Sequence, residues 1–192
     1  MNSEPGRKIV LYTLTSLDGA VDDPAGYFSP DPARNAPPDF DTEMEEFEAA
    51  VTSTQDTVLL GRHMYDEWSV YWPTSDVQPF ADFINGVKKY VLTSTPLTKP
   101  WNNAEAVGGP LAEVVRDLKG RPGGDIGVHG SVQLAQSLLA EGLVDELRLV
   151  VGPVLGCPGR RLVEPPGDLR RMTLRSARPT STGSLLLSYR VQ

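Results

Sequence analysis

Short apolar segments alternate along this chain with segments whose apolar residues recur at helical spacing. Strands are indicated at residues 9–14, 57–60, 89–92, 126–128 and 147–151, and helices at 76–86, 111–119, 132–139 and from Asp41 or Thr42 onward. Residues 172–178 and 184–191 alternate between apolar and polar, which predicts a C-terminal antiparallel hairpin. The pattern predicts one α/β domain over residues 1–192, with a mostly parallel central sheet and flanking helices.

The segment from Gly124 to Gly156 carries the most information. An apolar strand is followed by the break His129-Gly130-Ser131, and a helix then runs to Gly142, which is placed to end it. The first amides of a helix lack partners within it and favour an anion in front of them. Gly130 would let a ligand approach the backbone, and Ser131 could cap the helix or donate to a phosphate. The alternative is an ordinary strand-to-helix turn.

Composition restricts the classes of protein that remain. The 192 residues are 40% hydrophobic and 22% charged, with a net charge of -7, which argues against nonspecific binding to nucleic acid or anionic membranes. Cys157 is the only cysteine and His63 has no companion ligands, so we expect no disulfide and no metal site. Because neither a secretory signal nor a membrane-spanning run is evident, we expect a cytoplasmic protein.

Three predicted strand ends carry polar or glycine-rich sequences. Gly61-Arg62-His63 follows one strand, Thr93-Ser94-Thr95 follows the next, and His129-Gly130-Ser131 follows a third. Ligands of open α/β sheets bind at the carboxyl ends of strands. The Arg62 guanidinium suits a phosphate, so the three ends together fit a nicotinamide dinucleotide with a 2′-phosphate. Taken singly, each has a structural explanation: a surface ion pair, a turn, and a packing glycine.

These segments, in this order, resemble the dihydrofolate reductase-like superfamily. The likeness is closer to its bacterial branch related to the C-terminal reductase domain of the riboflavin-biosynthesis bifunctional enzyme. The matching pieces are Ser16-Leu17-Asp18-Gly19, Leu59-Leu60-Gly61-Arg62-His63-Met64-Tyr65, Val91-Leu92-Thr93-Ser94, Gly127-x-x-Gly130-Ser131, Gly142-Leu143-Val144-Asp145-Glu146-Leu147 and Pro153-Val154-Leu155-Gly156.

The resemblance implies NADPH as the cofactor and assigns residues to its parts. Gly61 and Arg62 match the pair that approaches the phosphates, and Thr93 and Ser94 match residues near the adenosine and its 2′-phosphate. The pyrophosphate turn and the nicotinamide segment are matched by longer runs, which are His129, Gly130, Ser131 and Val132, and Leu17, Asp18 and Gly19. The folate enzymes usually have glycine where His129 stands, so the His129 side chain would alter the peptide geometry or contact the ligand.

The sequence says less about the substrate and the proton donor than about the cofactor. The folate enzymes hold the pterin ring with an acid on the first long helix, and counting back from Gly61 places Glu45 or Glu46 there. That helix is rich in acids, so a solvated face is the alternative. The proton would come from Asp18, from Glu45 or Glu46, or from water. A flat substrate would be contacted by aromatic side chains, and the candidates are Tyr27, Tyr65 and Trp68.

We therefore expect an NADPH-dependent reductase of a small pteridine-, pyrimidine- or flavin-related heterocycle, acting by hydride transfer. The alternatives are a non-catalytic nucleotide- or flavin-binding protein such as a redox sensor, and a structural domain with a vestigial cleft. Residues 22–41 form a long acidic, proline-rich segment that we expect to act as a lid, the alternative being a surface loop without a role. Apolar strands near the C-terminus, together with the resemblance, predict a homodimer.

Overall fold

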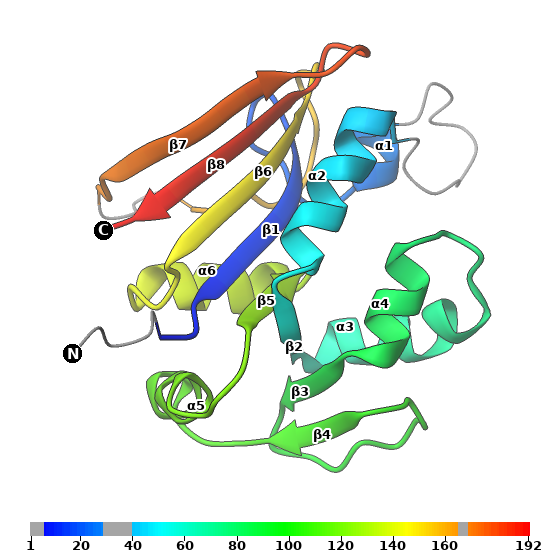
Figure 1. The fold of residues 1–192 in the computed structure, drawn as a ribbon, viewed down its shortest axis with the longest axis vertical. Helices are drawn as coiled ribbons and strands as arrows, with labels where there is room; N and C mark the ends of the chain where they lie inside the picture. Colours follow the sequence, from blue (N-terminus) through cyan, green and yellow to red (C-terminus); the bar gives the residue numbers. More distant parts are fainter. Residues whose placement is uncertain (1–5, 29–39, 165–168) are drawn as a thin grey trace.

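The computed structural model describes residues 6–28, 40–164 and 169–192, which build one eight-stranded sheet with helices on both faces (Figure 1). The strands are β1 Ile9–Ser16, β2 Gln55–Gly61, β3 Lys88–Leu92, β4 Ala104–Val107, β5 Asp125–His129, β6 Glu146–Gly152, β7 Met172–Pro179 and β8 Leu185–Val191. The helices are α1 Pro24–Phe28, α2 Thr42–Thr52, α3 Arg62–Tyr71, α4 Phe80–Gly86, α5 Leu111–Lys119 and α6 Val132–Ala140, with a 3-10 turn η1 at Trp72–Thr74.

The strand order is β4-β3-β2-β5-β1-β6-β8-β7. The first six strands in this order, from β4 across to β6, all pair in parallel with their neighbours. Strand β8 runs antiparallel to both β6 and β7. The expected mostly parallel sheet with an antiparallel C-terminal hairpin is therefore confirmed. Because the carboxyl ends of parallel strands meet at one edge, the turns after β1, β2, β3 and β5 all open toward the same end of the molecule.

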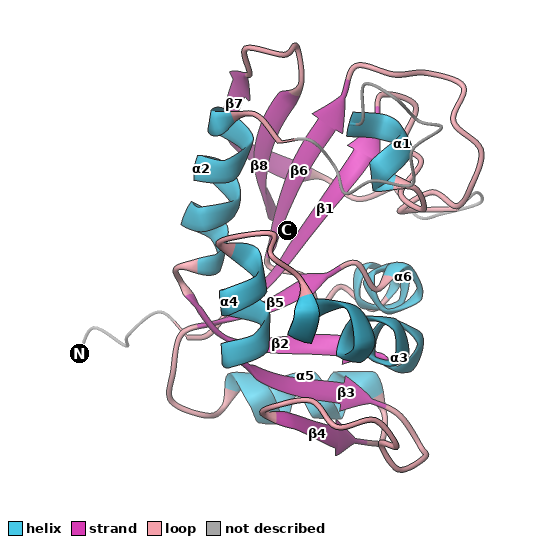
Figure 2. Cartoon of the chain, turned by 90° about the vertical axis from the view of Figure 1, so that its right-hand side faces the viewer, coloured by secondary structure: helices cyan, strands magenta, loops and turns pink. Residues whose placement is uncertain are grey.

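Helices lie on both faces of the sheet (Figure 2). Apolar side chains pack them there. Helices α5 and α6 cover one face, where their leucines and valines join alternate residues of β1, β5 and β6. On the other face, α2 packs on β1 and β6, and α3 and α4 pack on β2. The apolar stripe Met44, Phe47 and Val51 orients α2 and leaves Glu45 and Glu46 exposed.

The structure adds elements that the pattern did not predict. Helix α3 occupies the mixed aromatic and polar segment, where the buried Tyr65 and Ser69 face inward at helical spacing. Strand β4 is a four-residue strand at the edge of the sheet with no buried residue, so it lacks an apolar signal. Gly142 ends α6 as expected, because its φ of 69° lies in the left-handed region and the Leu143 amide returns to the Leu138 carbonyl.

The segment expected to be a lid begins with the short helix α1. Tyr27 is buried, and its hydroxyl accepts a hydrogen bond from the Asp23 amide at 3.2 Å. Phe28 and Phe40 pack at the margin of the α2 core with their rings 6.3 Å apart. Residues 29–39 lie outside the described residues, so the lid stays a prediction.

The C-terminal strands carry a continuous apolar face that extends beyond α5 and α6. Paired positions line up across β6, β8 and β7: Leu147, Tyr189 and Leu174; Leu149, Leu187 and Ala177; Val151, Leu185 and Pro179. Leu147 is buried against the helices, but exposure increases toward the edge strand β7, where Leu174 is 52% exposed. A solvent-facing apolar strand at a sheet edge favours association.

We expect this face to pair two copies of the chain. Sedimentation at micromolar concentration should give about twice the 20.9 kDa chain mass. Leu174→Glu should shift the mass toward the monomer without changing far-UV circular dichroism, because it places a charge on the apolar face. Leu169→Glu is the matched control, since Leu169 is 86% exposed and lies before β7. A wild-type monomer at every concentration would contradict the expectation.

Candidate functional site

The carboxyl edge of the sheet gathers the segments that the sequence singled out. The register pairs β2 with both β3 and β5, and β5 with β1. Their ends at Gly61, Leu92, His129 and Ser16 therefore lie along one edge, followed by the predicted cofactor segments. The structure thus brings together the three strand ends and the Leu17-Asp18-Gly19 turn.

Two helices begin side by side at this edge. Helix α3 starts directly after β2, and α6 starts one turn after β5. The Gly61 amide donates a hydrogen bond to the Ser131 hydroxyl at 3.0 Å, which ties the two starting points together. Neither helix has a side-chain cap, because the cap residue of α3 is glycine and the Ser131 hydroxyl is used across the gap. Two sets of unpaired amides therefore adjoin, an arrangement suited to a diphosphate.

The structure explains the glycine at position 130 by side-chain packing rather than by ligand access. Its φ of 68° favours glycine, and a Cβ there would lie 2.9 Å from Trp68 Cζ2 and 3.0 Å from Met64 Cε. The space beside Gly130 is thus taken by side chains of α3 rather than left open for a ligand. This corrects the expectation that the glycine lets a ligand approach through that space, and it places Trp68 against the turn.

Arg62 connects the ends of β2 and β3. Its Nε bonds to the Asp66 carboxylate at 2.9 Å, and its Nη1 donates to the Thr95 hydroxyl at 2.6 Å and the Pro96 carbonyl at 3.1 Å. Thr93 also bonds to Thr95, whereas Ser94 is exposed. The surface ion pair considered for Arg62 is therefore present, and the guanidinium lies beside the Thr93-Ser94 segment at the same time.

Asp18 is poorly suited to donate a proton. The Ser16 hydroxyl donates to its carboxylate at 2.7 Å, and Arg161 Nη2 lies 3.2 Å away. The Ser16 hydrogen bond and the Arg161 charge lower the pKa of Asp18 below its usual value, so the group is ionised at neutral pH. Asp18 as the proton donor therefore stays a prediction, and its contacts with Ser16 and Arg161 argue against that role. Leu17, 56% exposed, and Gly19, with a φ of 87°, flank it in the turn.

The acid of α2 that reaches the core is Glu48. Glu45 and Glu46 are exposed, whereas Glu48 is partly buried at the border of the apolar stripe. The pKa of Glu48 is raised to about 7, chiefly by burial, with a smaller rise from the nearby Glu45 charge and an opposing effect of the Tyr12 hydroxyl. The interpretation of these acids as one solvated face missed Glu48. Its spacing from Met44 and Val51 was the available signal.

His129 turns its side chain away from the edge. The ring is buried on the α2 and α4 side, with ring centroids of Phe80 at 5.5 Å and Phe83 at 5.9 Å. Its Nε2 lies 2.8 Å from Gln55 Oε1, and burial lowers the pKa of His129 to about 3. The ring is therefore neutral and does not contact a ligand at the turn, which corrects that alternative.

The three aromatic candidates for substrate contact separate in the structure. Tyr65 is fully buried beside Trp101 and donates its hydroxyl to the Lys99 carbonyl, so it packs rather than lines a site. Tyr27 is buried in α1. Trp68 is partly buried, edge-on to Trp72 at 5.6 Å, and it adjoins Gly130 at the edge.

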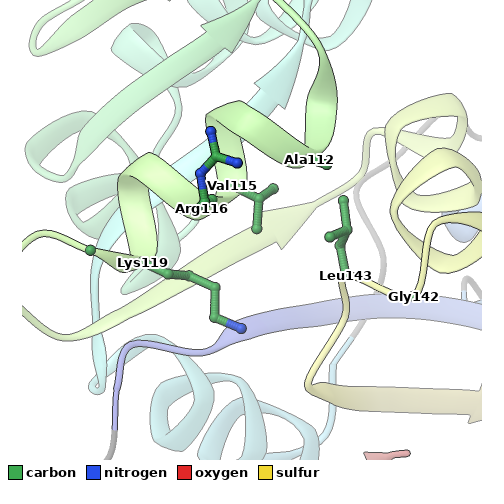
Figure 3. Close-up of a pocket in the computed structure, with 7 residues that line it drawn as sticks. Ala112, Val115, Arg116, Lys119, Gly142 and Leu143 are labelled. Carbon is green, nitrogen blue, oxygen red and sulfur yellow. The ribbon is translucent and has the colours of Figure 1, made fainter.

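The surface cavity elsewhere in the described residues is a weaker candidate for a functional site than this edge. A surface cavity of about 460 Å³ lies between the end of α5 and the turn at Gly142-Leu143 (Figure 3). It adjoins the opposite end of the strands, and Lys119 at its border is paired with Asp145 at 2.6 Å. Within the described ranges, no three acid, histidine or cysteine side chains group to hold a metal ion, and no helix is long and apolar enough to cross a membrane.

Comparison with known proteins agrees with this architecture. The chain is 30% identical over 138 residues to the uncharacterized protein YyaP of Bacillus subtilis (strain 168), covering 70% of this chain and 73% of YyaP. A second uncharacterized Bacillus subtilis protein, YwjB, is 28% identical over 149 residues, or 78% of each chain.

Solved structures share the fold at low identity. A putative riboflavin biosynthesis protein from Shewanella sp. PV-4 matches with a TM-score of 0.72 at 19% identity, over 96% of this chain and 99% of its own. Dihydrofolate reductase from Enterococcus faecalis, complexed with NADP(H), matches with a TM-score of 0.61 at 10% identity, over 96% of each chain. The family model of the RibD C-terminal domain matches residues 7–186. The chain therefore belongs to the RibD C-terminal domain family, with a dihydrofolate reductase-like fold.

Proposed function

We propose that this protein is a reductase that binds NADPH across the carboxyl edge of its sheet and reduces a C=N or C=O bond of a small flat heterocycle. The observation that carries the proposal is the pair of uncapped helix starts at α3 and α6, joined by the Gly61–Ser131 hydrogen bond. Membership of a reductase-domain family and the similarity to an NADP(H)-complexed dihydrofolate reductase support it.

The cofactor would run along the edge. Its pyrophosphate would accept hydrogen bonds from the first amides of α3 and α6, which follow Gly61 and Ser131 and include that of Val132, because the Gly61 and Ser131 amides already donate within the chain. Its 2′-phosphate would lie by Arg62, Thr93 and Ser94. The nicotinamide would lie toward Leu17 and Gly19, and when bound it supplies a hydride. Backbone atoms of His129 and Gly130 would shape the turn between these parts.

The heterocycle would lie between α2 and α3. Trp68 supplies a flat surface on the α3 side, next to the turn at Gly130. Tyr12 of β1 and Phe47 of α2 belong to the neighbouring apolar cluster under α2, and Glu48 lies at its border. A flat ring would stack on the tryptophan.

The first experiment measures binding and turnover separately. Calorimetric titration should show NADPH binding, and loss of the reduced-nicotinamide absorbance should follow addition of one member of a panel of pyrimidines, pteridines and flavins. Binding without turnover on any member would favour the alternative of a nucleotide-binding sensor. No dinucleotide binding at all would overturn the proposal.

Gln133→Glu tests the helix starts without removing a structural contact. Gln133 is exposed in the first turn of α6. The new charge should repel a pyrophosphate and weaken NADPH binding by about fivefold, on the order of 1 kcal/mol. The same charge favours the helix dipole, so thermal stability should be unchanged or slightly higher. Gln192→Glu at the chain end controls for net charge. Equal NADPH affinity in both variants would place the cofactor elsewhere.

The cofactor preference tests Arg62. A charge-assisted contact to the 2′-phosphate contributes roughly 1.5–3 kcal/mol, so NADPH should bind about tenfold or more tightly than NADH. Arg62→Gln should reduce NADPH affinity toward that of NADH while NADH affinity changes little. A loss of both affinities would instead reflect the broken link between Arg62, Asp66 and Thr95. Equal wild-type affinity for the two dinucleotides would contradict the assignment.

A further inference from the structure

The segment that follows β6, residues 153–164, lies against the turn that follows β1, and we call this segment the clasp. The Leu17 amide donates to the Val154 carbonyl at 3.0 Å, and the Val21 amide donates to the Arg160 carbonyl at 3.0 Å. The clasp and the turn leave neighbouring parallel strands at the carboxyl edge of the sheet. The backbone of the turn beside the proposed nicotinamide position is therefore bonded to a distant part of the chain.

Arg161 is the side chain of the clasp that reaches this turn. Its Nη2 lies 3.2 Å from the Asp18 carboxylate, and the same guanidinium donates to the Gly159 carbonyl at 3.0 Å and the Cys157 carbonyl at 3.3 Å. Its stem runs beside Gly19, where a Cβ would lie 3.6 Å from Arg161 Cδ. Because carbonyls of its own loop hold the planar guanidinium in one orientation, Arg161 fixes the position of the carboxylate that it pairs with.

Asp18 links the two segments, and both of its oxygens are engaged. Its Oδ1 accepts a hydrogen bond from the Ser16 hydroxyl at 2.7 Å, and its Oδ2 faces Arg161. The Ser16 hydroxyl in turn accepts from the Ala20 amide at 2.8 Å, which closes the turn on itself. The side chains of Asp18 and Arg161 are 27% and 32% exposed. A pair exposed to this extent adds little to global stability, so its effect is on the orientation of the turn.

The clasp also connects the turn to α6. Gln136, in the second turn of α6, donates from Nε2 to the Arg161 carbonyl at 2.8 Å. Arg161 also forms an antiparallel backbone bridge with Ala20 of the turn. The backbone of Arg161 is thus bonded to the helix whose start would bind the pyrophosphate, while its side chain is bonded to the turn that would contact the nicotinamide. One residue therefore sets the position of these two parts relative to each other.

We infer that Arg161 is a positioning residue, which acts through Asp18 to hold the turn at Leu17 against the nicotinamide. The inference rests on the proposed function. Leu17 is 56% exposed at the edge, where its apolar side chain would lie against the ring. Hydride transfer needs the reacting atoms about 3–3.5 Å apart, so a displaced turn would misplace the reacting half of the cofactor. The adenosine half, bound at the other strand ends, would keep its contacts.

A second ion pair keeps the clasp in place when Arg161 is replaced. Arg160 pairs with Asp22 at 2.7 Å, beyond the turn, and the Arg160 amide donates to the same carboxylate at 2.7 Å. The backbone bonds between the clasp and the turn also remain. The expected defect of an Arg161 variant is therefore a loosely oriented turn rather than an unfolded chain.

The test compares two ligands, of which NADPH spans the whole edge and 2′-phospho-ADP-ribose lacks the nicotinamide. In calorimetric titration, Arg161→Gln should weaken NADPH binding about fivefold or more, because the turn must be ordered on binding. Its affinity for 2′-phospho-ADP-ribose should be unchanged. Arg171→Gln removes the same charge from an exposed position just before β7, and this control should bind both ligands as the wild type does.

Asp18→Asn tests whether Arg161 acts through the ion pair. It should weaken NADPH binding to a similar extent, and the double variant with Arg161→Gln should bind no more weakly than either single variant. With the substrate that the panel identifies, each single variant should lower kcat by up to about 100-fold with little change in the KM of the heterocycle. Arg161→Lys keeps the charge beside Asp18 and should recover part of the loss. Additive losses in the double variant would overturn the action through Asp18.

Hydrogen exchange gives a readout that needs no ligand. The Leu17 and Val21 amides are bonded to the clasp, so Arg161→Gln should speed their exchange while amides in the middle of β1 keep their protection. Arg171→Gln should leave both groups as in the wild type. Unchanged exchange at Leu17 and Val21 in Arg161→Gln would show that the turn does not depend on Arg161, and would overturn the inference.

The two proposals fail in different ways. If the wild type binds NADPH and Arg161→Gln weakens both ligands equally, or weakens neither, this inference is overturned and the proposed function stands. A wild type that binds neither NADPH nor 2′-phospho-ADP-ribose would overturn the proposed function and this inference together.

Discussion

The hydrogen bond from the Gly61 amide to the Ser131 hydroxyl joins the two helix starts on which the candidate site depends. It connects neighbouring parallel strands, β2 and β5, at the point where each chain turns into a helix. A serine that capped its own helix would satisfy one amide of α6 and leave the two helices independent. Here the hydroxyl is used across the gap, so both sets of amides remain directed at the space in front of the edge.

The Gly130 turn is built around this link rather than around open space. Its left-handed backbone lets Trp68 and Met64 of α3 pack against it, which seats α3 beside α6. Arg62 extends the same edge to the segment after β3 through Thr95 and Pro96. The candidate cofactor edge and the Trp68 side chain therefore share one set of packing contacts, and a change in one part would move the other.

On the face of the sheet under α2, buried polar atoms without hydrogen-bond partners lower the stability of the fold. A core built for stability alone would place apolar side chains where Tyr12, Gln55 and His129 leave polar atoms unpaired. The hydrogen bond between Gln55 and His129 passes over Gly127, where any side chain would clash with both. Polar groups retained at this cost beside a candidate site are typical of positions selected for chemistry rather than for packing.

The sequence by itself determined the fold class, the sheet edge and the segments along it, because periodicity and strand-end chemistry are local signals that survive without coordinates. Gly142 as a helix end and the C-terminal hairpin are examples. Only the tertiary structure decided which side chains of those segments are available. It buried Tyr65 and the His129 ring, engaged Arg62 and Asp18 in ion pairs, and partly buried Glu48 while it left Glu45 and Glu46 exposed. Burial and pairing depend on contacts such as the one between Tyr12 and His129, which are far apart in the chain, and no local pattern encodes them.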